Sequence, residues 1–399
     1  MNINHKRSIY WMVLVVMALG VAACQPVGTP DLSMAGTYAA QTMAAIPEET
    51  QNPSPTEEVT EVVTDTATPI PTLGPVGPTG FPDDVNPLTG LQVADSTILD
   101  RRPVLVKVAN YPISGRPHAG LSYADMVFEY YIGAGANRFM GLFYGQDIDK
   151  IGPVRSGRLV DPYIVSLYEG VLGMESAYIT VYDHITDILG NRVISGRDTC
   201  PALCDDGRYI VTSVFANSEA MTTYGSEHGV DNRRYNLDGM AFDPAAPNGG
   251  ESGTKASVLF TRFNRGEWLF DEDSGKYLRW IEEGDGTGSG MIPLVDRITD
   301  EQLAFSNVVL LFANYTELAP ALHDIDLWNV VGQRAIVFRD GQAYDLTWTT
   351  PQRDLPIQYL DENGEVFPLK PGNTWVVIFG ENSNVTEADG EWTFEFHMP

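Results

Sequence analysis

The chain has 399 residues, of which 43% are hydrophobic, enough for one to three globular domains. Its 53 acidic residues outnumber 25 lysines and arginines, and the formal net charge is -28. Nucleic acid and anionic membrane surfaces both require a basic face on the protein, so this charge excludes nucleic-acid binding and polybasic membrane binding as main functions.

The N-terminus predicts a lipoprotein signal peptide over residues 1–23. Lys6 and Arg7 form a short basic start, and the apolar run that follows up to Ala23 is too short to span a bilayer. Small residues directly before Cys24 are what a lipoprotein signal peptidase accepts. We therefore expect a lipid on Cys24 that anchors the mature protein to the cell membrane, facing the extracytoplasmic side. An uncleaved N-terminal anchor is the alternative.

Residues 24–80 predict a disordered acidic stalk. They are rich in Pro, Thr, Ser, Ala and Glu and contain no Lys or Arg, and their scattered apolar residues cannot form a core. A flexible chain of this length spans on the order of 40 Å. We expect the stalk to hold the folded body away from the lipid, within the cell wall zone.

Residues 81–240 predict an α+β N-terminal domain of mixed strands and helices. Asp161 is a good N-cap, and Pro162 suits the first position of a helix, so a helix is expected to begin here. The glycines of 133–135 predict a hairpin turn. The expected strands are 104–110, 125–132 and 138–144, and the expected helices are 161–169, 178–189 and 216–224.

Residues 241–254 are rich in Pro, Gly and Asn and predict a linker to a β-rich C-terminal domain over 255–399. A hairpin is expected around the turn at 271–275. The spacing of the short strands suggests a sandwich or a barrel-like, mainly antiparallel sheet. The expected strands are 268–270, 276–280, 307–312, 335–338, 342–348, 374–379 and 392–396.

Two further cysteines, Cys200 and Cys204, are separated by three residues. Outside the membrane the setting is oxidising, so a local disulfide is plausible. Free thiols are a second interpretation. A metal or redox site is a third, but it would need Asp205 and Asp206 as further ligands, and a thioredoxin-like motif has two residues between its cysteines.

Arg138, Arg155, Ser156 and Arg158 form the sharpest candidate site. The last three precede the helix expected at Pro162, and guanidinium groups beside the amides of a helix start can bind an anion.

The alternative is structural. Arg158 could pair with Asp161, which as N-cap would already occupy the helix start with its own carboxylate. Arg138 could likewise pair with Glu129 across the hairpin, because arginines so placed usually satisfy nearby carboxylates.

Catalytic and metal signatures are weak in this sequence. There is no Gly-x-Ser-x-Gly elbow, the histidines lack zinc spacing, and no glycine-rich phosphate loop follows a strand. We therefore expect no metal, no cofactor and a non-enzymatic binding or scaffold role in the envelope, with peptidoglycan or an envelope protein as partner. A cell-wall hydrolase or transferase with a carboxylate pair, such as Asp125 and Glu129, is the alternative.

The run Ile-Gly-Pro-Val-Arg-Ser-Gly-Arg at 151–158 is the most specific of several segments that occur in order between about Asn86 and Ile378. Together these segments resemble the YerB-like lipoprotein family. The resemblance implies two domains of unknown function in an envelope lipoprotein and brings no active site. One departure is that family members often carry Pro-His-Asn where this chain has Thr212–Asn217, without histidine. The other resembling segments are 124–129, 138–140, 306–309, 324–327, 359–365 and 369–375.

Overall fold

The computed structural model describes residues 74–284, 286, 288 and 290–398. The predicted signal peptide, Cys24 and the stalk up to residue 73 lie outside the described residues. Residues 74–80, which the sequence assigns to the stalk, are bound to the body: the amide of Val76 donates to the carbonyl of Phe242 at 2.9 Å. The body therefore begins before residue 81, because a segment rich in proline and glycine can still pair its backbone.

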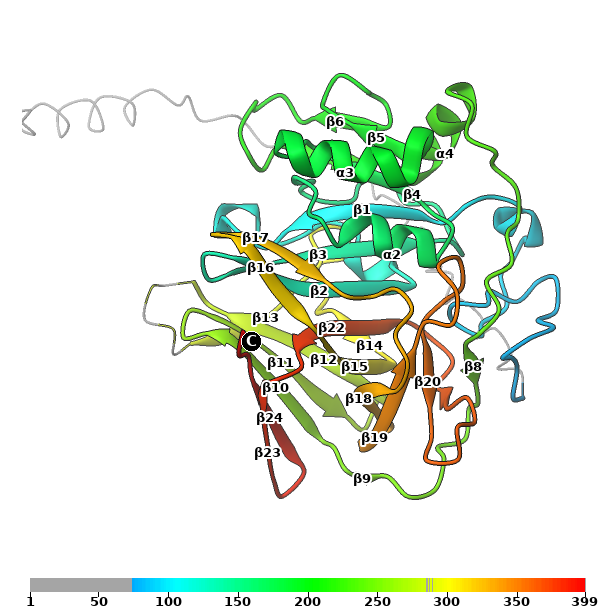
Figure 1. Cartoon of the computed structure of the whole chain (residues 1–399), viewed down its shortest axis with the longest axis vertical. Coiled ribbons are helices and arrows are strands. Elements are labelled where there is room, and N and C mark those ends of the chain that lie inside the picture. The colour runs from blue at the N-terminus through cyan, green and yellow to red at the C-terminus, as the bar shows by residue number, and fades with distance from the viewer. Residues whose placement is uncertain (1–73, 285, 287, 289, 399) are drawn as a thin grey trace, which may run out of the picture. The chain divides into compact units, whose positions relative to one another are not determined.

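Strands dominate the regular structure, helices are few, and a mixed sheet forms the centre of the body (Figure 1). From one edge to the other its strands are β20 (Gln358–Leu360), β19 (Gln342–Thr349), β18 (Gln333–Arg339), β15 (Asn307–Ala313), β22 (Thr374–Gly380), β2 (Met126–Gly133), β3 (Ala136–Phe143), β1 (Val104–Ala109), β4 (Val171–Met174) and β5 (Val193–Ser195). β9 (Glu251–Ser252) pairs with β19 off this path. In Figure 1 the sheet runs from β5 at the top to β20 at the lower right.

The centre of this sheet joins parts of the chain that are far apart in sequence. β2 and β22 run parallel, with Met126 paired to Thr374. β22 is buried along its whole length, and β2 is buried at all but one position. A strand that is covered on both faces suits an uninterrupted apolar run such as 375–379. The two halves of the chain therefore share one sheet across the predicted domain boundary.

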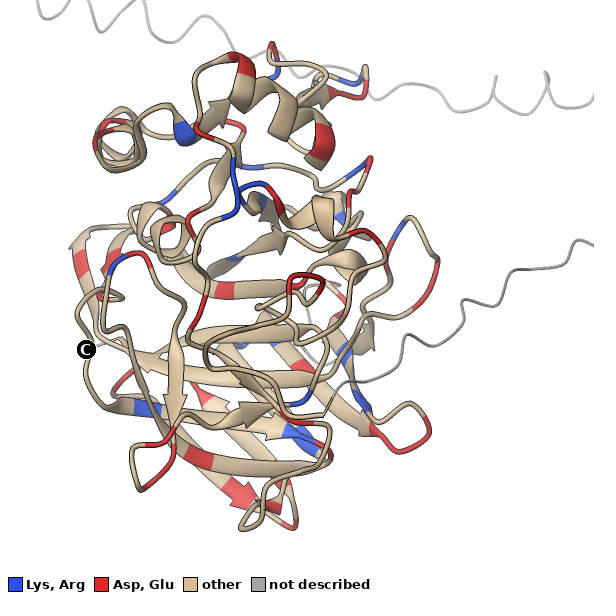
Figure 2. Ribbon diagram, turned by 90° about the vertical axis from the view of Figure 1, so that its right-hand side faces the viewer, with Lys and Arg blue, Asp and Glu red and all other residues tan. Residues whose placement is uncertain are grey.

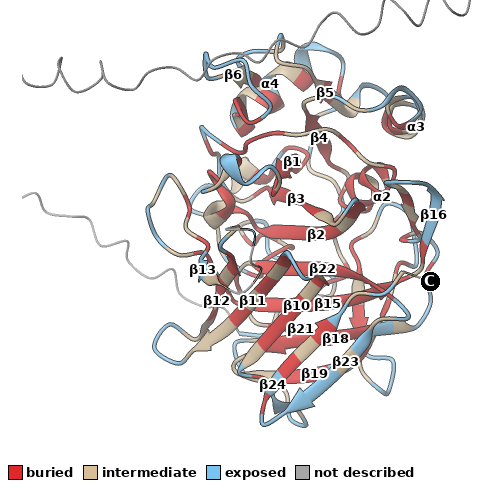
Figure 3. Ribbon diagram, turned by 90° about the vertical axis from the view of Figure 1, so that its left-hand side faces the viewer, coloured by how far each residue is buried: buried red, intermediate tan, exposed pale blue. Residues whose placement is uncertain are grey.

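A second sheet packs on one face of the large sheet. Its strands are β13 (Met291–Pro293), β12 (Lys276–Glu282), β11 (Asn264–Asp271), β10 (Lys255–Thr261), β24 (Glu391–Glu395) and β23 (Asn384–Ala388), and β14 (Ala304–Phe305) pairs with β12. Apolar side chains of both sheets fill the space between them, and the rings of Trp268 and Trp375 lie 5.8 Å apart there. In Figure 3 the central strands of the large sheet are mostly buried, whereas β10, β11 and β12 of the second sheet carry both buried and intermediate residues.

Helices cover both faces of the large sheet near β1 and β4. They are α2 (Asp161–Leu167), α3 (Ile179–Leu189) and α4 (Ser218–Glu227). α2 and α3 contribute Ile164 and Ile185 to the core on the face opposite the second sheet. α4 contributes Met221 to the core on the same face as the second sheet. Within the described residues, no helix has the length and apolar content needed to cross a bilayer.

Short strand pairs complete the body. Residues 241–254, for which the sequence predicts a linker, carry β8 and β9, so this segment is paired to the body at both ends. The pairs are β16 (Tyr315–Ala319) with β17 (Leu322–Ile325), β21 (Pro368–Leu369) with β8 (Ala241–Phe242), and β6 (Leu203–Asp205) with β7 (Val214–Ala216).

Candidate anion-binding site

Residues 151–160 carry the arginine motif between β1 and β4, at the carboxyl ends of these two strands. β1 and β4 pair in parallel over three residue pairs only, and beyond that point this segment enters between them. The amide of Arg155 donates to the carbonyl of Lys107 at 2.9 Å, and the amide of Glu175 donates to the carbonyl of Arg155 at 3.1 Å. The arginines therefore lie at the carboxyl ends of two parallel strands, which is where ligands bind in open sheets of this kind.

A buried trio of polar side chains forms the floor of the site. The ammonium of Lys107 on β1 lies 3.0 Å from the carboxylate of Asp161 at the start of α2, and both side chains are 0% exposed. The hydroxyl of Tyr130 on β2 is hydrogen-bonded to the same carboxylate. Burial lowers the pKa of Lys107 to about 7, against the attraction of Asp161. The nearby guanidinium groups of Arg138 and Arg158 lower this pKa further.

Two guanidinium groups lie beside this trio and donate to backbone carbonyls. Arg138 on β3 is only 6% exposed and donates to the carbonyl of Ser156. Arg158 donates to the carbonyl of Gly157 at 2.8 Å. Burial lowers the pKa of Arg138, and the positive charges of Arg158 and Arg155 lower it further. The three arginines therefore repel one another.

Arg155 lies at the more exposed side of the cluster. Its guanidinium donates to the carbonyl of Val211 at 3.3 Å and lies 3.7 Å from the carboxylate of Glu175. The hydroxyl of Ser156, next to it in the chain, lies 3.2 Å from the hydroxyl of Ser176. The structure therefore brings together all four residues that the sequence singles out.

The cluster has more positive than negative charge, and its donors are incompletely used. Lys107 and the three arginines share two carboxylates, those of Asp161 and Glu175. The buried Nε–H groups of Arg138, Arg155 and Arg158 have no hydrogen-bond partner among the described residues. A buried donor without a partner costs on the order of 1–3 kcal/mol, so an anion that accepts from these groups would be stabilised.

The pairing predicted between Arg138 and Glu129 is wrong. In the β2–β3 hairpin Arg138 is paired with Tyr130, and Glu129 is paired with Phe139. Successive side chains of a strand point to opposite faces, so Arg138 points to the face that carries α2 and Glu129 points to the second sheet. There Glu129 pairs with Arg279 at 3.2 Å.

Asp161 also differs from its predicted role. It is the first residue of α2 and not its N-cap, which is Val160. Its carboxylate accepts from the amide of Arg158 at 2.8 Å, while its ion pair is with Lys107. The predicted contact between Arg158 and Asp161 therefore exists through the backbone, and the guanidinium is left for other acceptors.

Sequence reasoning missed Lys107 and Tyr130. The signal for Lys107 was a lysine in the middle of the apolar run Val-Leu-Val-Lys-Val-Ala at 104–109. Lysine is almost never fully buried without a partner, so its position in a covered strand indicates a buried ion pair. Tyr130 carries no comparable signal, because tyrosine is common in half-buried strands.

Cys200 and Cys204 are joined by a disulfide with their Cα atoms 4.7 Å apart. Among the described residues, no group of three or more His, Cys, Asp or Glu side chains is arranged to hold a metal ion.

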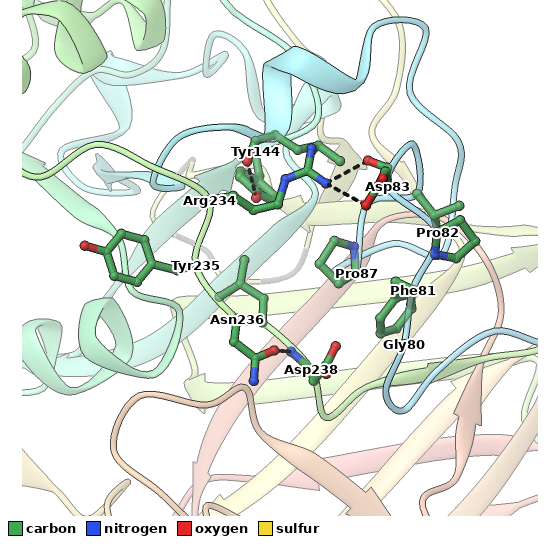
Figure 4. A pocket seen from close by; sticks show the side chains of 13 residues that line it. Gly80, Phe81, Pro82, Asp83, Pro87, Tyr144, Arg234, Tyr235, Asn236 and Asp238 are labelled. Atoms are coloured by element: carbon green, nitrogen blue, oxygen red, sulfur yellow. Dashed lines mark hydrogen bonds and ion pairs between the residues drawn. The ribbon is translucent and has the colours of Figure 1, made fainter.

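A cavity of about 390 Å³ lies elsewhere, between residues 80–87 and residues 234–238 (Figure 4). Its polar groups are engaged by the protein itself. Arg234 donates to the carbonyl of Asp83 at 2.8 Å, and the hydroxyl of Tyr144 donates to the carbonyl of Leu99 at 2.6 Å. These contacts fasten the segment before β1 to the body, and they indicate no particular ligand.

Two comparisons define the class of protein. Residues 88–231 match "Protein of unknown function (DUF3048) N-terminal domain", and residues 257–376 match "Protein of unknown function (DUF3048) C-terminal domain". The crystal structure of the YerB protein from Bacillus subtilis has the same fold. It matches with a TM-score of 0.63 and 23% identity, over 74% of this chain and 96% of that chain.

A curated relative specifies the family further. The chain is 26% identical over 318 residues to "Putative lipoprotein YerB" of Bacillus subtilis (strain 168), which covers 76% of this chain and 89% of that protein. The chain belongs to the YerB-like lipoprotein family, as its sequence segments predicted. The family is described only as of unknown function, so the site must be interpreted from its own geometry.

Proposed function

We propose that this chain is a membrane-anchored, extracytoplasmic binding protein of the cell envelope that holds an anionic group at the arginine cluster of Arg138, Arg155 and Arg158. The observation that carries the proposal is the gathering of three guanidinium groups, which repel one another, beside the buried Lys107 and only two carboxylates. The positive charges of Arg155 and Arg158 act on Arg138, and this repulsion raises the free energy of the cluster. An anion would relieve this repulsion.

The proposed location rests on the sequence around Cys24 and on the relative described as a lipoprotein. Two or three acyl chains on Cys24 would give a stable anchor where one alone would be marginal. Mass spectrometry of the mature N-terminus tests this part. A diacylated Cys24 is the expected result, and an unmodified Cys24 or an uncleaved start would contradict it.

The domain division remains part of the proposal. The two family matches are separated by residues 232–256, a stretch that includes the predicted linker 241–254. Within this division we propose that the mixed N-terminal half supplies the anion site and that the β-rich half supports it through the shared sheet.

The envelope offers carboxylates of wall peptides and of proteins, and phosphates, as anions for this site. A guanidinium bound by a carboxylate or phosphate gains charge-assisted hydrogen bonds, each worth on the order of 1.5–3 kcal/mol. Loss of two such arginines is therefore expected to reduce affinity by at least about tenfold.

Calorimetric titration of the mature chain with inorganic phosphate, and with acetate, tests the binding function. We expect saturable binding that Arg155→Ala/Arg158→Ala weakens at least about tenfold. Arg334→Ala is the matched control, because Arg334 is an exposed arginine paired with Asp345 on the neighbouring strand. Equal affinity in the double variant, with its fold intact, would overturn the proposal.

The alternative of a wall hydrolase would need a pair of carboxylates that can act on a substrate. The carboxylates considered for it serve the fold: Asp125 accepts from Asn86 and from the amide of Tyr144, and Glu129 accepts from Arg279 and Trp375.

A further inference from the structure

Five large apolar side chains near the arginine cluster are exposed to solvent. Tyr178 and Ile179 lie at the start of α3, and Tyr209, Ile210 and Val211 lie on the loop between β6 and β7; their exposed fractions range from 45% to 75%. Figure 3 shows exposed segments around β6 at the top of the body. Single exposed apolar residues are ordinary, but groups of them that lie together mark interaction surfaces.

The β6–β7 loop is held in place by its own contacts. The disulfide between Cys200 and Cys204 precedes it. The carboxylate of Asp205 accepts from the amides of Gly207 and Tyr209, each at 2.9 Å. Tyr209 has a φ of +52°, which costs energy in a residue other than glycine and is maintained by these bonds. The loop therefore presents its apolar side chains from a fixed backbone.

Charged contacts connect the two apolar loops to the arginine cluster. Arg155 donates to the carbonyl of Val211, within the apolar run itself. Arg197 pairs with Asp205 at 3.0 Å and with Glu175 at 2.8 Å, so it joins the base of the β6–β7 loop to the segment before α3. Arg155 also lies next to Glu175. Arg155 therefore lies beside the backbone of the β6–β7 loop and beside the segment that leads into α3.

We propose that Arg155 and these two loops form a docking surface for an envelope protein that presents an extended segment with a carboxylate flanked by large apolar side chains. This inference rests on the proposed function and names its ligand. The carboxylate accepts from the guanidinium groups, and its neighbours cover Tyr178–Ile179 and Tyr209–Val211. Buried apolar anchors beside a charged pair are the usual source of affinity in protein interfaces.

Two other occupants fit less well. Acidic residues are spread over the loops of the body (Figure 2), and a chain of net charge -28 is repelled by an anionic lipid surface. A wall peptide with small side chains would satisfy the arginines but leave five large apolar side chains uncovered. A protein segment satisfies both parts of the surface.

Site-specific photocrosslinking in the native cell envelope tests this surface. A benzophenone amino acid replaces Tyr209 in the full-length lipoprotein, and the crosslinked product is mapped by mass spectrometry. We expect a segment of one envelope protein with Asp or Glu between large apolar residues. The product should fall at least about tenfold in Arg155→Ala and in Ile210→Ser. The same amino acid at Leu91, an exposed apolar position on the segment before β1, should not give this product.

The outcomes separate this inference from the proposed function. A crosslink to lipid, to wall peptide, to a second copy of this chain or to nothing overturns the docking surface, as does a product that Ile210→Ser leaves unchanged. Phosphate titration of Ile210→Ser then tells the two apart. If Ile210→Ser binds phosphate as tightly as the wild-type chain does, the anion site stands and only the docking surface is wrong. If the wild-type chain itself does not bind phosphate, both proposals are wrong.

Discussion

Glu129 and Arg279 form an ion pair of 3.2 Å between side chains that are 2% and 0% exposed. Glu129 lies on β2 in the first half of the chain, and Arg279 lies on β12 in the second. The indole of Trp375 donates to the same carboxylate at 2.9 Å, and the guanidinium of Arg279 lies over the ring of Trp268 at 4.1 Å. This pair therefore joins the large sheet to the second sheet.

Replacing Arg279 with Met should destabilise the protein by about 3–5 kcal/mol, because Glu129 would be left buried without its counter-charge. Burial raises the pKa of Glu129, and the loss of Arg279 would raise it further. The folded state of the variant then binds a proton more tightly than the unfolded state, so its stability should recover as pH falls below that pKa. Urea unfolding at several pH values measures this; a cost below about 1 kcal/mol at neutral pH would contradict the account.

Lys107 should make the protein more stable as the pH rises above 7. Its pKa is lowered from 10.5 to about 7 in the folded state, so between these values the unfolded chain binds the proton more tightly. Stability should therefore rise with pH, by about 2 kcal/mol between pH 7 and pH 9. Lys107→Met removes the group and should remove this rise. An unchanged pH profile in the variant would show that Lys107 is not the titrating group.

Asp161→Asn should increase the affinity for anions while it lowers stability. The carboxylate is the nearest counter-charge to Lys107, and its loss should cost about 3–5 kcal/mol. Loss of this negative charge, which would repel a bound anion, should raise phosphate affinity about fivefold. Thermal unfolding in increasing phosphate at constant ionic strength measures both effects. Equal sensitivity to phosphate in the variant and the wild type would argue against an anion site here.

Removing the disulfide with Cys200→Ser/Cys204→Ser should affect the β6–β7 loop more than the whole fold. The closed loop is short, so the entropic cost is limited to about 2 kcal/mol. The amides of Gly207 and Tyr209 donate hydrogen bonds to the carboxylate of Asp205, and their hydrogen exchange should become faster. Unchanged protection of these amides would show that the hydrogen bonds alone hold the loop.

The local elements of this fold could be predicted from sequence. Gly133 and Gly135, which both have positive φ, mark the turn of the β2–β3 hairpin, and Asp161-Pro162 marks the start of α2. The motif at 151–158 also placed Arg155, Ser156 and Arg158 together, because they are neighbours in the chain. Such signals depend on residues that are close in sequence.

The long-range pairings could not be predicted in this way. The apolar run of β22 predicts a buried strand, but it does not predict that β2 is the neighbouring strand. Such a run indicates burial and does not identify a partner. The partner of Glu129 was missed for the same reason. Arg138 is close to Glu129 in sequence and lies on the same hairpin, but the pleat places the two side chains on opposite faces of the sheet. The actual partner, Arg279, belongs to the second sheet.

The anion site is tested most directly by the Nε–H resonances of the arginines. In a titration of the mature chain with phosphate, those of Arg138, Arg155 and Arg158 should shift together with one dissociation constant, because one anion would act on all three neighbouring guanidinium groups. Those of Arg334, which already donates to Asp345, should stay in place. If the three cluster resonances do not shift, or shift no more than that of Arg334, the arginine cluster is a structural feature and not a binding site.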